Sequence, residues 1–282
     1  MAEKKEVLRP QIVDMAEEQI TYVDGVAYTV QEDGPYRLDA FWDDAAPRPM
    51  PAIIWIHGGG FTEEHVTRKS RPEKSFLELA RKGFFIASID YRLAQVKPFP
   101  AQIEDAKCAV RYLRSHADKW EIDPDRIGVW GESCGGQLAG LMAVQEGIPD
   151  FEDKGGWPSV PSTVQAAVSW YGGFDILAFE NMLKDERFLI MYGGSAEEKR
   201  DLVIKASPIT YADKKLCPFL AMCSNTDPRV PDVQSAAFCE KASKHGNDAG
   251  FMMVPGQGHG YFEGDEYYQK IYAFFEKHLK QS

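Results

Sequence analysis

A serine in a tight turn is the sharpest chemical signal in this chain. Ser133 lies in Gly131-Glu132-Ser133-Cys134-Gly135-Gly136, which matches the pattern G-x-S-x-G. The match follows an apolar run at 127–130, typical of a buried strand, and precedes a predicted helix. Glycines on both sides let the strand and the helix approach closely, and the strained turn projects the hydroxyl above a sheet. This context predicts a nucleophilic Ser133 rather than a chance serine at a strand–helix junction.

A run of three glycines is the second signal. The segment His57-Gly58-Gly59-Gly60-Phe61 directly follows an apolar run at 52–56 that predicts another buried strand. Consecutive glycines allow backbone N–H groups to turn toward a developing negative charge, as in the oxyanion-hole loop of lipase- and esterase-like hydrolases. A phosphate-binding loop is the competing interpretation, but neither G-x-G-x-x-G nor a G-K-[ST] ending is present. His57 belongs to this loop, and we do not expect it to be the general base.

A histidine that follows Ser133 supplies the candidate general base. Three of the six histidines qualify, namely His245, His259 and His278. His245 and His278 fall in predicted helices, on outer turns where a solvated histidine is the usual explanation. His259 lies in a glycine-rich loop at 255–261, directly after the last predicted strand, from which it can reach the serine. The chain order serine, acid, histidine therefore predicts His259 as the base.

The acidic partner of the histidine is sought after the predicted strand at 219–223. The loop at 224–232 contains two aspartates, Asp227 and Asp232. Asp227 is the first aspartate after the strand, so it is the favoured acid. Asp232 directly precedes a predicted helix, where an aspartate commonly caps the first turn, and it remains the alternative.

Alternating strands and helices must position these side chains. Strands are predicted at 21–30, 36–42, 52–56, 84–89, 127–130, 166–171, 219–223 and 251–254, and helices at 73–82, 100–120, 137–144, 233–245 and 267–279. Residues 1–18 predict an arm or a short helix. An antiparallel start followed by strand–helix alternation predicts an α/β fold, with a mostly parallel central sheet and helices on both of its faces.

Two segments break the alternation, at 147–163 and 174–213. Both are rich in glycine, proline and aromatic residues. We expect them to be insertions over one edge of the sheet that form a small lid. No linker is long enough to divide the chain, so residues 1–282 are expected to form a single domain.

Composition excludes several classes of protein. The chain has 282 residues, enough for a full core, with 44% apolar and 27% charged residues, which excludes a disordered chain, a collagen-like fibre and a membrane-spanning bundle. A net charge of −11 argues against nucleic acid or a membrane as the main partner. Five cysteines without C-x-x-C spacing argue against a disulfide scaffold or a zinc cluster. The charged start lacks the apolar run of a secretory signal, so we expect a soluble, cytoplasmic protein.

Together these motifs resemble the α/β-hydrolases of the esterase and lipase type. The resemblance spans residues 52–262 and rests on the two glycine motifs, the histidine loop and intervening segments, which are Asp90-Tyr91-Arg92-Leu93, Pro98-Phe99-Pro100-Ala101, Asp105 and Asp123-Pro124-Asp125-Arg126-Ile127. The chain is similar to hormone-sensitive-lipase-like carboxylesterases and to bacterial acetylxylan/feruloyl-esterase-like enzymes. The pattern Asp227…Val230-Pro231 favours the second group. Cys134 departs from both, because alanine often follows the serine there.

The resemblance implies a set of roles and an activity. Ser133, Asp227 and His259 would form the catalytic triad, and the backbone amides of Gly59, Gly60 and Cys134 would form the oxyanion hole. The activity would be that of a serine carboxylic-ester hydrolase, which acts through an acyl-enzyme on short-chain acyl esters, including acetyl or feruloyl esters of plant carbohydrates. The alternatives are a small peptidase or aryl formamidase with the same triad, and a non-catalytic hydrolase-fold binding protein.

Phe61 in the glycine loop and large apolar residues in and near the two insertions, among them Phe179 and Met191, are candidates to line the pocket, although core packing explains each of them as well. The candidates favoured to bind the substrate are Phe61, Trp157, Phe174 and Tyr192. No cofactor motif and no pair of metal ligands is recognised, so we expect neither a cofactor nor a metal. The expected partner is a small-molecule or oligosaccharide ester substrate. The oligomeric state is left open, and a dimer is compatible with the sequence.

Overall fold

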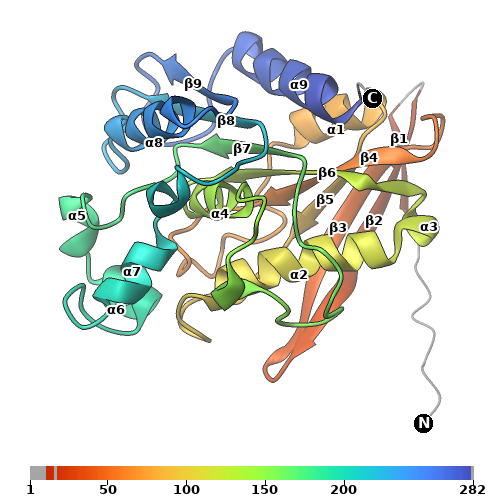
Figure 1. Cartoon of the computed structure of the whole chain (residues 1–282). Coiled ribbons are helices and arrows are strands. Elements are labelled where there is room, and N and C mark those ends of the chain that lie inside the picture. Colours follow the sequence, from red (N-terminus) through yellow and green to blue (C-terminus); the bar gives the residue numbers. More distant parts are fainter. Residues whose placement is uncertain (1–10, 16–17, 281–282) are drawn as a thin grey trace.

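The computed structural model describes residues 11–15 and 18–280 of the chain. The described strands form one sheet in the order β1-β2-β3-β5-β4-β6-β7-β8-β9 (Figure 1). Their bounds are β1 Gln11–Met15, β2 Glu18–Gln31, β3 Gly34–Asp43, β4 Met50–Ile56, β5 Phe85–Ile89, β6 Ile122–Glu132, β7 Ala166–Trp170, β8 Phe219–Ser224 and β9 Ala249–Val254. The strands β1, β2, β3 and β5 pair antiparallel, whereas the run from β5 to β9 through β4 is parallel. The predicted fold class is confirmed.

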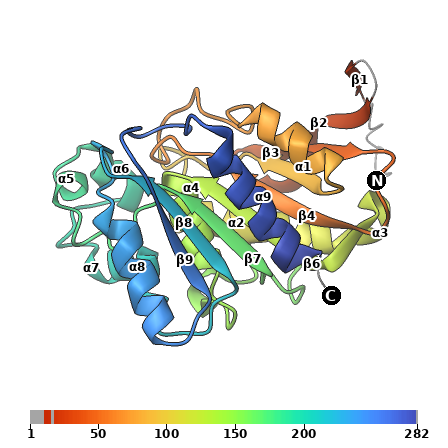
Figure 2. The same cartoon turned by 90° about the horizontal axis from the view of Figure 1, so that it is seen from above.

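Helices cover both faces of the sheet. The first face carries α1 (Glu73–Arg81) and α9 (Asp265–Leu279), which lie across it in Figure 2. The second face carries α2 (Ala101–Ser115), α4 (Cys134–Met142) and α8 (Val233–Lys244). The shorter helices are α3 (Ala117–Trp120), α5 (Glu180–Leu183), α6 (Arg187–Tyr192), α7 (Arg200–Ala206) and the 3₁₀ turns η1 (Pro149–Phe151) and η2 (Pro208–Tyr211).

The central strand β4 shows why continuous apolar runs in the sequence predict buried strands. Every residue of β4 is buried. Side chains alternate between the faces, so that Ile53 and Trp55 pack with α1 and α9 while Ile54 and Ile56 pack with the opposite layer. A fully buried isoleucine side chain contributes about 1.5–3 kcal/mol relative to an exposed one. Such a strand therefore needs apolar residues at every position rather than at alternate ones.

Two elements differ from the predictions. Residues 11–15 form the strand β1, paired with β2, and not an arm or a helix, while the rest of residues 1–17 lies outside the described part. The predicted helix at 100–120 is divided at His116 into α2 and α3. The backbone of His116 leaves the helical region, with φ −116° and ψ 25°, and its ring contacts the backbone oxygen of Tyr112 at 2.8 Å.

A buried carboxylate anchors the loop between β4 and α1 to the edge of the sheet. Asp39, on β3, has a fully buried side chain and accepts hydrogen bonds from Arg68 Nε at 2.7 Å and Arg71 Nη1 at 2.6 Å. Lys69 Nζ lies 2.8 Å from the same carboxylate, and the backbone N–H of Gly25 donates to it at 2.9 Å. Burial opposes ionisation, but these cations and donors lower the pKa of Asp39 well below its usual range. The glycine run lies at the start of this loop, so Asp39 helps to fix the path of the chain that follows the glycines.

The two predicted insertions occupy different places. Residues 147–163 lie against α2, where Lys107 Nζ contacts Glu152 Oε1 at 2.5 Å and Arg111 Nε donates to the oxygen of Gly156 at 3.0 Å. Residues 174–213 contain α5, α6, α7 and η2, which gather at one end of the sheet (Figure 1). Only this second insertion contributes to the cavity described below, since no residue of 147–163 lines it.

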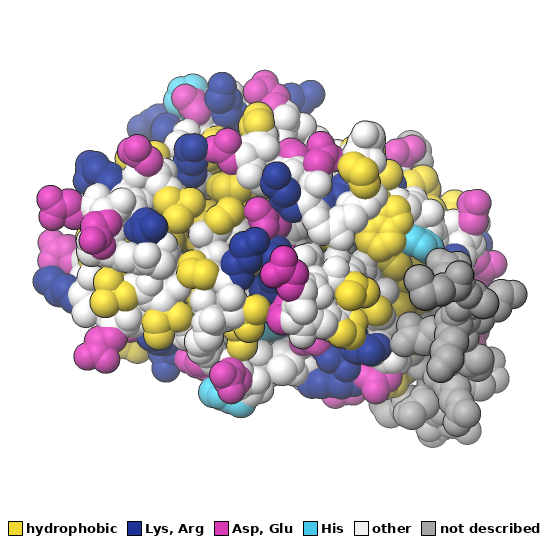
Figure 3. Space-filling model, turned by 90° about the horizontal axis from the view of Figure 1, so that it is seen from below, with side chains coloured by type: hydrophobic (Ala, Val, Ile, Leu, Met, Phe, Trp, Pro, Cys, Tyr) yellow, Lys and Arg dark blue, Asp and Glu magenta, His cyan; other side chains and the backbone are white. Residues whose placement is uncertain are grey.

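The surface mixes charges of both signs. On the face drawn in Figure 3, basic and acidic side chains are interspersed and do not separate into large fields of one sign. Among residues 11–15 and 18–280, no helix combines the length and the hydropathy needed to span a bilayer.

Candidate active site

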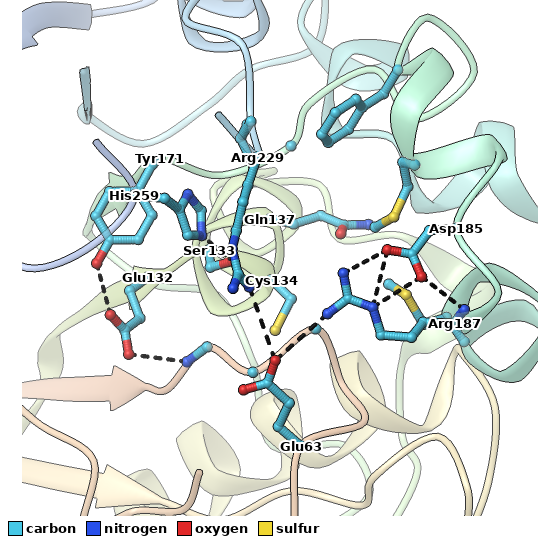
Figure 4. Close-up of a pocket in the computed structure, with 18 of the residues that line it drawn as sticks. Glu63, Glu132, Ser133, Cys134, Gln137, Tyr171, Asp185, Arg187, Arg229 and His259 are labelled. Carbon is cyan, nitrogen blue, oxygen red and sulfur yellow. Dashed lines mark hydrogen bonds and ion pairs between the residues drawn. The ribbon is translucent and has the colours of Figure 1, made fainter. Parts of the chain in front are cut away.

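The parallel strands bring four loops to one edge of the sheet. The loops after β4, β6, β8 and β9 all leave from carboxyl ends, which coincide in a parallel arrangement. They surround a cavity of about 420 Å³ (Figure 4). The lining includes Gly58, Gly59, Gly60, Glu63, Glu132, Ser133, Cys134, Gln137, Tyr171, Ile176, Phe179, Met182, Asp185, Arg187, Met191, Arg229, Val230 and His259.

Ser133 occupies the strained turn that the sequence predicts. Its backbone has φ 52° and ψ −120°, a conformation that is rare for a residue with a side chain. The turn is tight because a Cβ atom on Gly135 would lie 2.1 Å from the backbone oxygen of Ile56. A Cβ atom on Gly131 would lie 2.1 Å from the oxygen of Gly135. Both positions therefore require glycine, and the helix α4 begins directly after the serine at Cys134.

The structure brings together the three side chains predicted as a triad. His259 Nε2 lies 3.0 Å from Ser133 Oγ, and His259 Nδ1 lies 2.6 Å from Asp227 Oδ2. The histidine is therefore within hydrogen-bond reach of both partners at once. This arrangement can pass a proton from the serine to the imidazole while the carboxylate stabilises the resulting imidazolium.

The Asp227 carboxylate is held by the loop from which it comes. Its Oδ1 accepts hydrogen bonds from the backbone N–H groups of Arg229 at 2.8 Å and Val230 at 2.9 Å. Burial raises the pKa of Asp227, but the hydrogen bond to His259 and these two N–H groups outweigh it, so the net effect is a lowered pKa. The alternative acid, Asp232, directly precedes α8, as predicted. Its side chain makes no capping hydrogen bond, so the predicted cap is wrong in that detail.

The loop that carries His259 is fixed against the loop after β8. Ser224 Oγ accepts hydrogen bonds from the backbone N–H groups of Gln257 at 3.0 Å and Gly258 at 3.2 Å. Asn225 Oδ1 accepts another from Gly256 at 2.9 Å. These side-chain contacts hold the glycine-rich loop in one position and so orient the imidazole.

The three residues predicted to form an oxyanion hole also line the cavity. Gly59 has φ +94° and Gly60 has φ +57°, values that favour glycine. Tyr91 donates its hydroxyl to the backbone oxygens of His57 at 2.9 Å and Gly58 at 3.0 Å, which fixes the start of this loop. Burial lowers the pKa of His57 to about 4, and its ring stacks on Tyr91 instead of approaching the serine.

The thiol of Cys134 is buried beneath the same loop. Its sulfur lies 3.5 Å from the hydroxyl oxygen of Tyr91. Burial raises the pKa of Cys134 to about 11, although the Tyr91 hydroxyl and the Phe61 backbone N–H partly counter this effect. A neutral thiol of this kind behaves as a small apolar side chain. All five cysteines are buried free thiols.

A second carboxylate, which sequence reasoning missed, lies beside Ser133. Glu132 Oε2 accepts the hydroxyl of Tyr171 at 2.8 Å, and Oε1 accepts the backbone N–H of Gly58 at 3.3 Å. The ring of Tyr171 lies 4.6 Å from that of His259 between centroids. Burial raises the pKa of Glu132, while its two hydrogen bonds lower it in part. The only sequence signal for this role is its place as the variable residue of the G-x-S-x-G motif.

The four aromatic residues predicted to bind substrate do not line the cavity, and this prediction is corrected. Phe61 and Phe174 are fully buried, with Phe61 against Tyr91 and Phe174 stacked on Phe238. Trp157 packs on Tyr112 and His116 of the α2 region. Tyr192 is buried behind Gln137, its hydroxyl 3.4 Å from the Gln137 amide nitrogen. Phe61, Phe174 and Tyr192 belong to the core, and the partly buried Trp157 packs against it, so core packing explains all four.

Other side chains form the walls of the cavity. An apolar wall comes from the second insertion and the loop after β8, and consists of Ile176, Phe179, Met182, Met191 and Val230. A charged wall consists of Glu63, Asp185, Arg187 and Arg229 (Figure 4). Val230 belongs to the Asp227…Val230-Pro231 pattern, and Phe179 and Met191 belong to the apolar residues of the insertions that are expected near the pocket. No sequence motif places the other wall residues at the site. Within the described ranges, no three His, Cys, Asp or Glu side chains are grouped closely enough to hold a metal ion.

Comparison with curated proteins identifies esterases among the relatives. The chain is 29% identical over 81% of its length to esterase LipC of Mycobacterium tuberculosis, covering 58% of that protein. It is 32% identical over 69% of its length to esterase LipQ of the same organism, covering 46% of it. The chain therefore spans about half the length of the curated relatives it matches.

Comparison with solved structures and family models supports the fold. A truncated carbohydrate esterase from gut microbiota has a TM-score of 0.80 and 28% identity, over 93% of this chain and 97% of that one. A bifunctional GH43-CE protein from Bacteroides eggerthii has a TM-score of 0.83 and 28% identity, over 92% of this chain and 35% of that one. The BD-FAE family model matches residues 38–242. The chain therefore belongs to the BD-FAE family and has the α/β-hydrolase fold.

Proposed function

We propose that this protein is a serine carboxylic-ester hydrolase that acts through an acyl-enzyme. The observation that carries the proposal is the continuous contact from Ser133 Oγ to His259 Nε2 at 3.0 Å and from His259 Nδ1 to Asp227 Oδ2 at 2.6 Å. The strained backbone of Ser133 and the adjacent glycine loop support it, because both suit a nucleophile facing a site for negative charge. The esterase relatives support the reaction class.

In this proposal the reaction has two halves. Ser133 Oγ attacks the carbonyl carbon of the ester, and its proton passes to His259 Nε2. The carbonyl oxygen, now negative, accepts hydrogen bonds from the backbone N–H groups of Gly59, Gly60 and Cys134. The bond to the alcohol then breaks, and His259 gives its proton to the leaving oxygen. Water then attacks the acyl carbon and gives a proton to His259 Nε2, the bond from Ser133 Oγ to the acyl carbon breaks, and His259 returns the proton to Ser133 Oγ as the carboxylic acid leaves. Asp227 stabilises the imidazolium each time it forms.

We propose short-chain acyl esters of carbohydrates, with acetyl or feruloyl groups, as substrates. The cavity of about 420 Å³ lies in the range of small-molecule sites and has one apolar and one charged wall, which suits an ester with an apolar acyl part and a polar alcohol. The similarity to the truncated carbohydrate esterase from gut microbiota supports the same class. The partner would be a small-molecule or oligosaccharide ester, handled by a single hydrolase domain whose residues 174–213 act as a small lid over the cavity.

A substrate panel with a matched inactive variant tests this proposal. The panel contains p-nitrophenyl acetate, acetylated xylo-oligosaccharides, a feruloyl sugar, N-formylkynurenine and a peptide amide. We expect hydrolysis of the esters and a loss of roughly 10⁴–10⁶ in kcat for Ser133→Ala, with the fold retained by circular dichroism. Rates that are no higher for the wild type than for Ser133→Ala would overturn the proposal. Faster cleavage of N-formylkynurenine or the peptide than of any ester would assign the triad to the alternative reactions.

A further inference from the structure

The charged wall of the cavity is built from three separate segments. Glu63 comes from the loop after β4, Asp185 and Arg187 from the second insertion, and Arg229 from the loop after β8. Arg187 Nη2 lies 2.5 Å from Asp185 Oδ2, and its Nη1 lies 3.5 Å from Glu63 Oε1. Arg229 Nη1 lies 4.0 Å from the same Glu63 oxygen. Figure 4 shows Glu63 pointing toward both guanidinium groups. The wall therefore carries two positive and two negative side chains, and their charges cancel.

Hydrogen-bonding capacity remains at this wall. Arg187 uses Nε and Nη2 for Asp185, which leaves Nη1 directed toward Glu63 and the glycine loop. The contact of Arg229 with Glu63 is longer than a hydrogen bond, so the guanidinium donors of Arg229 are available to a ligand. The side chains of Glu63, Arg187 and Arg229 are 31%, 40% and 62% exposed. Ion pairs this exposed contribute only about 0–1 kcal/mol to stability, so the fold does not depend on them.

The wall lies close to the reacting groups. A Cβ atom on Gly60 would be 3.3 Å from Arg187 Nη1, so this guanidinium borders the loop proposed to hold the oxyanion. The backbone N–H of Arg229 donates to Asp227 Oδ1, so this residue follows directly from the loop of the acid. An ester bound at Ser133 has an acyl side and an alcohol side. The apolar wall suits an acyl chain, which leaves the charged wall to the alcohol.

We propose that Glu63, Asp185, Arg187 and Arg229 form a subsite for the hydroxyl groups of a neutral sugar on the alcohol side of the ester. This inference rests on the proposed ester hydrolysis and names the feature that selects its substrate. Sugar hydroxyls both donate and accept hydrogen bonds, which matches a wall of mixed donors and acceptors. An apolar alcohol would cover these charges without pairing them, at a cost in free energy. An anion would meet the carboxylates of Glu63 and Asp185, and Glu132 lies in the same cavity.

A pair of acetyl esters that differ only in the alcohol tests the subsite. The variants are Arg187→Met and Arg229→Met, which keep the length of the side chain and remove its charge. The control is Lys184→Met, since Lys184 is 75% exposed and pairs with Glu180 on α5, outside the residues that line the cavity. Each protein is assayed with acetylated xylo-oligosaccharides and with p-nitrophenyl acetate after its fold is checked by thermal unfolding.

The expected result is a selective loss. We expect kcat/KM on the sugar acetate to fall about 10- to 100-fold in each arginine variant, mainly through KM, because hydrogen bonds from a charged group are lost. The ratio of kcat/KM on the sugar acetate to kcat/KM on p-nitrophenyl acetate should therefore fall in both arginine variants, and Lys184→Met should match the wild type on both substrates. An equal loss on both esters would overturn the inference and place the arginines at the oxyanion. No loss on the sugar acetate would overturn it too, whereas a wild type inactive on both esters would refute the proposed function instead.

Discussion

Tyr171 donates its hydroxyl to Glu132 at 2.8 Å, and this hydrogen bond links the residue before Ser133 to the residue that packs against the imidazole of His259. Tyr171 directly follows β7 and has an unusual φ of 40°. The other oxygen of Glu132 accepts the backbone N–H of Gly58. One half-buried carboxylate therefore contacts both the glycine loop and Tyr171, and it directly precedes Ser133 in the sequence.

This relationship predicts a loss of rate without a loss of binding when Glu132 is replaced by glutamine. The amide has nearly the same shape, but it cannot accept from Tyr171 and from Gly58 at the same time. We expect kcat to fall about 10-fold or more, with KM nearly unchanged, because a hydrogen bond to a charged group is lost. Steady-state kinetics with p-nitrophenyl acetate measures both constants. Tyr171→Phe keeps the ring and the Gly58 contact, so its loss should be smaller. A full wild-type kcat in Glu132→Gln would refute the positioning role.

The choice between the two aspartates gives a second prediction. Asp227→Asn would present an amide to His259 Nδ1 and favour the wrong tautomer, so we expect kcat to fall by up to roughly 10⁴ with the fold intact. Asp232→Asn is the matched control, since the Asp232 side chain makes no capping hydrogen bond. It should keep kcat within about twofold and change stability little. The comparison requires kcat on one activated ester and circular dichroism of both variants. If Asp232→Asn were the impaired enzyme, the acid would be misassigned.

Cys134 is predicted to be chemically inert in spite of its place after the nucleophile. Because burial raises its pKa to about 11, the thiol stays protonated at neutral pH and a thiolate forms only in strong base. Iodoacetamide near neutral pH should therefore leave esterase activity unchanged for hours. Cys134→Ala should keep activity within about threefold, since only the backbone amide is needed for the proposed oxyanion hole. Rapid inactivation of the wild type that Cys134→Ala abolishes would show a reactive thiol instead.

The ion cluster around Asp39 predicts a pH-dependent contribution to stability. The pKa of Asp39 is lower in the folded state than in the unfolded state. Its contribution to the free energy of unfolding is therefore fully present above the unfolded pKa of about 3.9, and it is lost as the pH falls from there toward the folded pKa. Asp39→Asn should lower the free energy of unfolding by about 3 kcal/mol near neutral pH, because buried cations lose their partner. The difference from the wild type should shrink below about pH 4, as urea unfolding at several pH values would show.

The control for this prediction is Asp24→Asn. Asp24 contacts two of the same cations, Arg68 and Lys69, but its side chain is 51% exposed. Asp24→Asn should lower the free energy of unfolding by less than about 1 kcal/mol. Equal costs for the two variants at neutral pH would mean that burial of Asp39 does not set the strength of the cluster.

The sequence predicts those parts of the molecule that local rules govern. The apolar run of β4 follows from burial of the strand on both faces, and the glycines around Ser133 follow from close approach of the backbone. The candidate acid and base follow from the chain order serine, acid, histidine. The structure places the three side chains in contact, as that order requires. The division of the helix at His116 was not predicted, because the apolar spacing continues across it.

The walls of the cavity depend on long-range packing, which no local pattern encodes. Arg187 and Met191 sit on a six-residue helix inside an insertion that has no clear periodicity. Trp157 belongs to the other insertion, whose contacts with α2 carry it away from Ser133. An aromatic residue near a motif in sequence is therefore a poor guide to a substrate contact, since the direction of its loop decides where it packs.

Covalent labelling of Ser133 tests the central claim most directly. A fluorophosphonate reacts with a serine only where a base removes its proton and an oxyanion hole receives the phosphoryl oxygen. We predict a single adduct on the tryptic peptide that contains Ser133, absent in Ser133→Ala and strongly slowed in His259→Ala and Asp227→Asn. Mass spectrometry of the intact and digested protein gives the stoichiometry and the site. An adduct at another residue, or unchanged labelling in Ser133→Ala, would contradict the proposal that this serine is the nucleophile.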